Sequence, residues 1–95
     1  MNLLAWLQSW FNQQCDGSWE HMEGIKIETL DNPGWSFEVC LEDTEYEHKE
    51  FSLIKDYRTE DDWIYCKIEN SKFKGYGGPL NLEEILNIFH DWVSS

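Results

Sequence analysis

Cysteine and histidine are the residues of this chain best suited to metal binding or nucleophilic chemistry, and each occurs three times. A zinc site requires these side chains in closely spaced pairs such as Cys-x-x-Cys. Each one here stands alone in the sequence: Cys15, His21, Cys40, His48, Cys66 and His90. The spacing therefore predicts neither a metal site nor a cofactor, and the odd number of scattered cysteines indicates a reducing, cytoplasmic compartment.

Cys15 and His21 lie six residues apart and could in principle form a thiol nucleophile and its base. Such a pair needs hydrogen-bond contact and surroundings that lower the pKa of the thiol. No glycine-rich turn or third orienting residue is evident beside Cys15, so a structural cysteine is the favoured interpretation. A small cysteine-dependent enzyme is kept as an alternative hypothesis, and no catalytic residue is assigned.

Carboxylates and glycines also occur in groups that could carry chemistry. Glu20, Glu23 and the run Glu60-Asp61-Asp62 could supply paired carboxylates, but hydrolysis also needs an environment that raises one pKa. The stretch Gly75 to Pro79 precedes a helical pattern but lacks the Lys and Ser/Thr of a phosphate-binding loop. Solvated loops and a turn before a helix explain these groups better.

Tryptophan beside acidic residues is the pattern most typical of a binding surface. Aromatic anchors surrounded by charge characterise protein-interaction hot spots, although tryptophan at a loop edge also commonly closes the end of a small core. The pattern occurs at three loop edges, which supply the candidate partner-binding residues: Trp19, Glu20, His21, Asp31, Asn32, Trp35, Asp61, Asp62 and Trp63.

Helical periodicity predicts a helix near each end of the chain. Apolar residues recur at helical spacing between Leu3 and Phe11, and Gly17 follows as a stop. A second apolar stripe runs from Leu82 to Val93. Asn81 with Glu84 three residues later predicts an N-cap for this closing helix.

Alternating apolar residues predict four or five strands between the helices. Residues 24–30 and 35–41 alternate on either side of Asp31-Asn32-Pro33-Gly34, which predicts a type II turn centred on Pro33 and Gly34. Residues 51–55 predict a third, shorter strand in a hairpin after the acidic, solvated loop 42–48. Residues 63–69 predict a central strand, and residues 72–76 a short edge strand protected by lysines.

Together these elements predict one α+β domain over residues 1–95. The predicted order is an N-terminal helix, an antiparallel four- to five-stranded meander sheet and a C-terminal helix packed on the sheet, with both helices on one face. A chain of 95 residues supports one core and is too short for two. It has no apolar run long enough for a membrane span and no basic signal-peptide start.

The charge is strongly one-sided, with 19 acidic against 7 basic residues and a formal net charge of −12. Such a surface repels nucleic acid and anionic membranes, and it accelerates association with basic proteins. Acidity also keeps proteins soluble without any partner, so the charge alone decides little.

Several longer motifs give the chain a resemblance to a known family. They are residues 15–21, the stretch 24–35, Glu60-Asp61-Asp62-Trp63, and Gly77-Gly78-Pro79 before Asn81-Leu82. From Trp6 to Trp92 the chain resembles the immunity protein 53 family. The resemblance implies a cytoplasmic inhibitor from a bacterial polymorphic toxin system, which binds a cognate toxin domain, expected to be basic, and needs no catalytic group.

The resemblance assigns no contact residues, so the candidate site depends on the loop-edge tryptophan pattern alone. The alternative is a small acidic adaptor or regulatory domain, which would bind a protein without protecting against a toxin.

Overall fold

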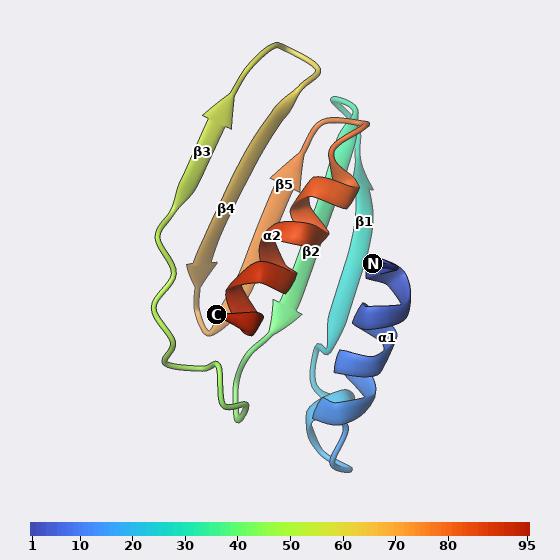
Figure 1. The fold of residues 1–95 in the computed structure, drawn as a ribbon, viewed down its shortest axis with the longest axis vertical. Helices are drawn as coiled ribbons and strands as arrows, with labels where there is room; N and C mark the ends of the chain where they lie inside the picture. Colours follow the sequence, from blue (N-terminus) through green and yellow to red (C-terminus); the bar gives the residue numbers. More distant parts are fainter.

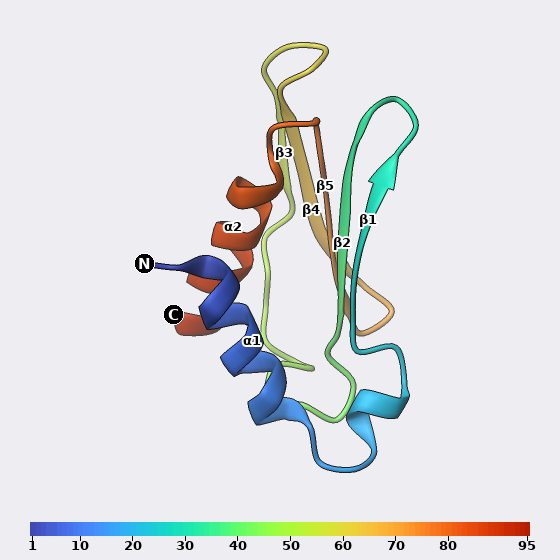
Figure 2. The same cartoon turned by 90° about the vertical axis from the view of Figure 1, so that its right-hand side faces the viewer.

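The computed structural model describes all 95 residues as an α+β fold with two layers. A five-stranded antiparallel sheet forms one layer, and both helices lie on the same face of it (Figures 1 and 2). The predicted fold class and the placement of the helices are therefore confirmed. Neither helix combines the length and apolar character needed to cross a membrane.

The two helices begin and end close to the predicted positions. Helix α1 spans Leu3–Gln14 and begins after Asn2, whose Oδ1 accepts a hydrogen bond from the Ala5 amide at 3.0 Å. Helix α2 spans Leu82–Ser94 and a single 3-10 turn, η1, spans Trp19–His21. The core lies between helices and sheet and comprises Leu7, Trp10, Trp19, Phe37, Val39, Cys40, Leu41, Ile64, Cys66, Phe73, Ile85, Leu86, Phe89 and Trp92.

The strands are β1 (Ile25–Leu30), β2 (Gly34–Cys40), β3 (Ile54–Tyr57), β4 (Trp63–Glu69) and β5 (Lys72–Gly77). Their order in the sheet is β1-β2-β5-β4-β3, and every neighbouring pair is antiparallel. The predicted simple meander is wrong, because β2 pairs with β5 and the chain then crosses to the far edge. The predicted hairpin between the second and third strands is wrong for the same reason.

The crossing segment between β2 and β3 is anchored at the C-terminal end of α2, which explains why it does not form a hairpin loop. Trp92 Nε1 donates to the Glu50 carbonyl at 2.8 Å, and Lys49 Nζ donates to the Trp92 carbonyl at 2.7 Å. The rings of Tyr46 and Phe51 pack against Trp92. These contacts lead the chain past the end of the sheet, and β3 starts at Ile54 rather than at residue 51.

Strand β5 is the middle strand of the sheet, so the predicted edge position is wrong. Glycine normally weakens a strand, so Gly75 and Gly77 made a central position look unfavourable. In the fold these glycines are needed because there is no room for a side chain beneath α2. A Cβ at Gly75 would lie 2.5 Å from Ile85 Cγ2, and one at Gly77 would lie 3.0 Å from Ile85 Cδ1. Glycine lets α2 approach the centre of the sheet closely.

The connection between β1 and β2 is a three-residue loop and not the predicted type II turn. Leu30 pairs with Gly34, so only residues 31–33 form the turn, and the Asn32-Pro33 bond is cis. Gly34 has no positive φ and is already part of β2, which contradicts the predicted role of this glycine. A side chain there would overlap the Gly77 carbonyl on the neighbouring strand, so close approach accounts for the glycine.

Candidate partner-binding site

Two of the three predicted clusters lie at one end of the sheet, and the third lies at the other. The turn at residues 31–33, the β3–β4 loop at 58–62 and the β5–α2 connection at 78–80 meet at the top of Figure 1. We call this surface the loop end. Residues 19–21 form η1 near the bottom of the same view, so they belong to a different surface.

Trp19 is a core residue. Its side chain is 1% exposed, and Nε1 donates to the Cys40 carbonyl at 3.0 Å. The Glu20 carboxylate stabilises the bend between α1 and η1. It accepts hydrogen bonds from the amides of Glu20 itself, Asp16 and Gly17, which lower its pKa. Only His21 in this cluster is exposed. The structural interpretation of loop-edge tryptophan therefore holds for Trp19.

Trp35 connects two parts of the loop end. Its half-buried side chain lies over β5 on the helix face, and Nε1 donates to the Pro79 carbonyl at 2.9 Å. Asp31 and Asn32 are exposed in the adjoining turn, and neither side chain makes a hydrogen bond within the chain. Trp35 thus positions the connection to α2, while Asp31 and Asn32 face solvent.

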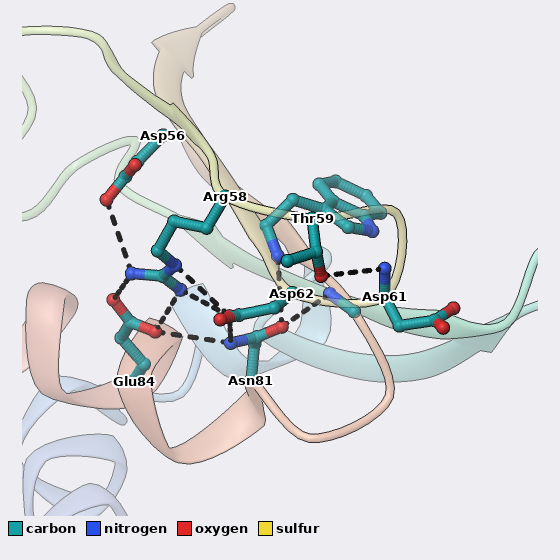
Figure 3. A network of polar contacts seen from close by, with 9 residues as sticks. Asp56, Arg58, Thr59, Asp61, Asp62, Asn81 and Glu84 are labelled. Atoms are coloured by element: carbon teal, nitrogen blue, oxygen red, sulfur yellow. Dashed lines mark hydrogen bonds and ion pairs between the residues drawn. The ribbon is translucent and has the colours of Figure 1, made fainter.

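Asn81 is the N-cap residue of α2, as predicted, but its side chain accepts no hydrogen bond from the helix amides and instead joins the segments of the loop end (Figure 3). The side chain is buried, with 6% of the residue exposed. Its Oδ1 accepts from the amides of Gly78 at 3.0 Å and Trp63 at 3.3 Å. Its Nδ2 donates to Asp62 at 3.0 Å and Glu84 at 3.2 Å. The amide therefore joins three segments instead of capping α2.

Arg58 completes this network with its whole guanidinium group (Figure 3). It donates to Asp62 Oδ1 at 3.1 and 2.8 Å, to both Glu84 oxygens at 3.0 and 2.8 Å, and to Asp56 at 3.2 Å. Arg58 lowers the pKa of Glu84, and Asn81 followed by Arg58 lowers that of Asp62. The Asp62 carboxylate is consequently engaged by groups of the protein itself although its side chain is half exposed, and the network fastens the β3–β4 loop to α2.

The outward groups of the loop end are acidic and aromatic. The carboxylates of Asp31, Glu60 and Asp61 make no hydrogen bond or ion pair within the chain. Tyr57 and Trp63 pair across β3 and β4 with ring centroids 6.0 Å apart. Together with Thr59 and Glu60, these two rings line a shallow hollow of about 330 Å³. This combination of charge and aromatic surface suits a protein partner.

Sequence analysis missed the roles of Tyr57 and Arg58. Tyr57 lies beyond the segment predicted as the third strand, so its pairing with Trp63 was not visible. A signal for Arg58 was present: it is the only arginine, and Asp62 follows four residues later among other acids. Its ion pair with Glu84 joins positions 26 residues apart and requires the fold.

The sheet face opposite the helices carries most of the positive charge. Five of the seven basic residues lie there, namely Lys26, Lys55, Lys67, Lys72 and Lys74. Glutamates lie among them: Lys74 and Lys67 approach Glu69 at 3.1 and 3.4 Å, and Lys72 pairs with Glu23. The open face is thus nearly neutral, and the negative charge is concentrated elsewhere.

The groups considered above for nucleophilic or metal chemistry are not arranged for it. The Cys15 thiol donates to the Phe11 carbonyl at 3.3 Å, and desolvation with nearby Glu20 and Asp16 raises its pKa. A nucleophile needs the opposite shift. Burial raises the pKa of Cys66 to about 12. No three His, Cys, Asp or Glu side chains are grouped as metal ligands.

Comparison with protein families identifies the chain. The family model described as Immunity protein 53 matches residues 4–94. The chain belongs to this family. Immunity protein 53 membership makes it an immunity protein directed against a toxin. Comparisons with curated proteins and with solved structures gave no match.

Proposed function

We propose that this immunity protein binds and neutralises a cognate polymorphic-toxin domain in the bacterial cytoplasm, and that the loop end forms the contact. The observation that carries the proposal is the set of unpaired carboxylates and aromatic rings displayed on a fixed frame. Asp31, Glu60 and Asp61 are free to pair with a partner, and Tyr57 and Trp63 supply apolar area beside them.

A fixed frame supports the proposal because a surface ordered before binding loses less entropy on association. Arg58 and Asn81 tie the β3–β4 loop to α2. Trp35, next to the β1–β2 turn, ties that part of the loop end to the β5–α2 connection. Trp19, Asp62 and Asn81 act in this proposal as supporting residues, since their side chains are engaged within the protein.

A basic toxin surface is the partner that the charge favours. The net charge of −12 attracts it over long range, and the three free carboxylates would pair with Lys or Arg in the complex. Blocking a toxin in this way requires contact and steric exclusion, with no reaction catalysed by the inhibitor.

The decisive experiment titrates the activity of the toxin domain encoded beside this gene with purified immunity protein. We expect loss of activity at a 1:1 ratio, a ratio that follows from one binding surface per chain. Tyr57→Ala and Asp61→Ala should each weaken binding by about tenfold or more, as expected of hot-spot residues. Glu42→Ala, at an exposed acid on the opposite end, is the matched control and should bind normally.

Each outcome separates the alternatives. If the toxin domain neither binds nor loses activity, the immunity function against that toxin is rejected. Binding without loss of activity would favour the adaptor hypothesis. Equal affinities for the Tyr57, Asp61 and Glu42 variants would reject the loop end as the contact while leaving the function intact.

A further inference from the structure

The three most exposed large apolar side chains of the protein gather around one groove. Leu80, Met1 and Leu4 are 93%, 83% and 60% exposed. They line two adjoining cavities of about 460 and 520 Å³, which share Met1, Leu3 and Glu83. Leu82 and Leu86 continue the apolar wall on the α2 side. Since α1 and α2 both begin here, the groove lies between their first turns.

The core does not account for these exposed side chains. Helix α1 buries Leu7 and Trp10, and Leu4 lies on its exposed side. Leu80 precedes α2, and the next turns of that helix bury Ile85 and Leu86. A single exposed leucine is ordinary, but a contiguous apolar groove with polar edges marks an interaction site.

Charge at the edge of the groove indicates the kind of partner. Glu83 is exposed and forms no ion pair within the chain, so its carboxylate is available to a cation. Glu84, the other carboxylate at this edge, accepts both of its ion-pair contacts from Arg58 of the loop end. The groove and the loop end are therefore continuous across the Arg58–Glu84 pair.

We propose that the groove receives a large apolar side chain of the toxin domain, flanked by a Lys or Arg that pairs with Glu83. This inference rests on the proposed function and extends its interface from the loop end onto the helix layer. Apolar anchors that fill a pocket and are ringed by charge carry a large share of the affinity in protein complexes. A partner with this pattern matches both the apolar walls and the acidic edge.

The test uses charge-neutral substitutions at exposed leucines. Leu4→Gln and Leu80→Gln remove apolar surface from the groove, whereas Leu53→Gln removes it from the β2–β3 segment and serves as the control. The probe is the toxin domain with its active site inactivated. We expect each groove variant to bind at least about tenfold more weakly, and the control to bind within about twofold of the unmodified protein.

A second measurement detects contact at the groove directly by NMR. In the ¹³C-methyl spectrum of the unmodified protein, the toxin domain should shift the methyl signals of Leu4, Leu80, Leu82 and Leu86. Failure of the unmodified protein to bind would reject the proposed function itself. Tight binding with unshifted groove methyls, or with normal affinity of both groove variants, would reject the groove alone. A loss at Leu53→Gln equal to that at the groove would also reject it.

Discussion

At the scale of single residues, Asn81 shows how one buried amide can define a surface. Its two acceptor contacts reach the amides of Trp63 and Gly78, and its two donor contacts reach Asp62 and Glu84. An amide is suited to this position because it offers donors and acceptors together without charge. Neither aspartate nor alanine can reproduce that combination.

Replacement of Asn81 should therefore destabilise the protein strongly. Asn81→Ala removes the side-chain acceptor of the Trp63 amide, leaves the Gly78 amide only the Trp63 carbonyl at 3.2 Å, and removes the donors to Asp62 and Glu84. We expect a loss of about 2 kcal/mol in the free energy of unfolding by urea denaturation. Asn87→Ala, at an exposed position on α2, is the control and should change stability little. A value for Asn81→Ala close to the control would contradict the role of the amide.

The variant Asn81→Asp should also lose stability, and the size of its loss should depend on pH. The new carboxylate would keep the acceptor contacts but would face Asp62 and Glu84, so three negative charges would meet. We expect the loss of stability to be larger at pH 7 than at pH 4, where protonation relieves the repulsion. A deficit independent of pH would show that the lost donors alone are responsible.

At the scale of elements, the ion-pair network joins the β3–β4 loop to the first turn of α2. The folded protein lowers the pKa of Asp62 and Glu84, so both carboxylates favour the fold when they are ionised. Their stabilisation is present above the pKa values of the unfolded chain and is lost as the pH falls through the folded values.

Arg58→Met removes the cation of this network and tests the linkage. Its stability should fall below that of the unmodified protein at pH 7, and the difference should shrink as the pH falls below about 5. Denaturation at a series of pH values measures the two curves. Lys55→Met removes an exposed cation that has no ion pair and should leave the pH dependence nearly unchanged. Parallel curves for Arg58→Met and the unmodified protein would contradict the linkage.

The packing of α2 against β5 is the second feature at the scale of elements. Gly75→Ala would place a methyl group against Ile85, and overpacking of this kind should cost about 2 kcal/mol. Combining it with Ile85→Ala creates space for the methyl group, so the double variant should be more stable than the sum of the single losses predicts. A double-mutant cycle measures the coupling, and strict additivity would contradict the contact.

Some of these elements could be predicted from the sequence and others could not. Periodicity located both helices, the strand at 63–69 and the strand predicted at 35–41, which spans 34–40 in the structure, because each buries one face or both. The order of strands was not predictable, since β5 takes the centre through pairing with β2, more than 30 residues away. Among the candidate residues, the structure places Asp31, Asn32, Asp61 and Trp63 at the loop end, whereas Trp19 is a buried core residue. The sequence pattern could not distinguish these two cases, because burial depends on the fold.

At the scale of the whole molecule, charge is segregated between surfaces. The open face of the sheet holds five of the seven basic residues, and only four of the nineteen acidic residues lie among them: Glu23, Glu28, Glu38 and Glu69. The loop end, the helix layer and the β2–β3 segment carry nearly all the remaining acids. A basic partner is therefore attracted to these surfaces more than to the lysines of the open face. The Tyr57–Trp63 pair, which the register places on the open face beside Lys55, lies where that face borders the acidic loop 58–62.

Association with the toxin domain should consequently depend on ionic strength. We expect the association rate constant to fall by about tenfold between roughly 20 mM and 500 mM salt, with a smaller change in the dissociation rate. Stopped-flow or surface-binding kinetics measure both constants. An association rate that does not respond to salt would contradict a basic partner surface.

The central position of β5 has a consequence for biosynthesis. Ribosomes make residues 72–94 after all the other strands, yet this region supplies the middle of the sheet and the helix beside α1. A nascent chain that ends at β4 lacks the strand that joins its two halves. The proposed contact surface at the loop end can therefore form only after that region leaves the ribosome, because Asn81 and Glu84, which fasten the β3–β4 loop, belong to it.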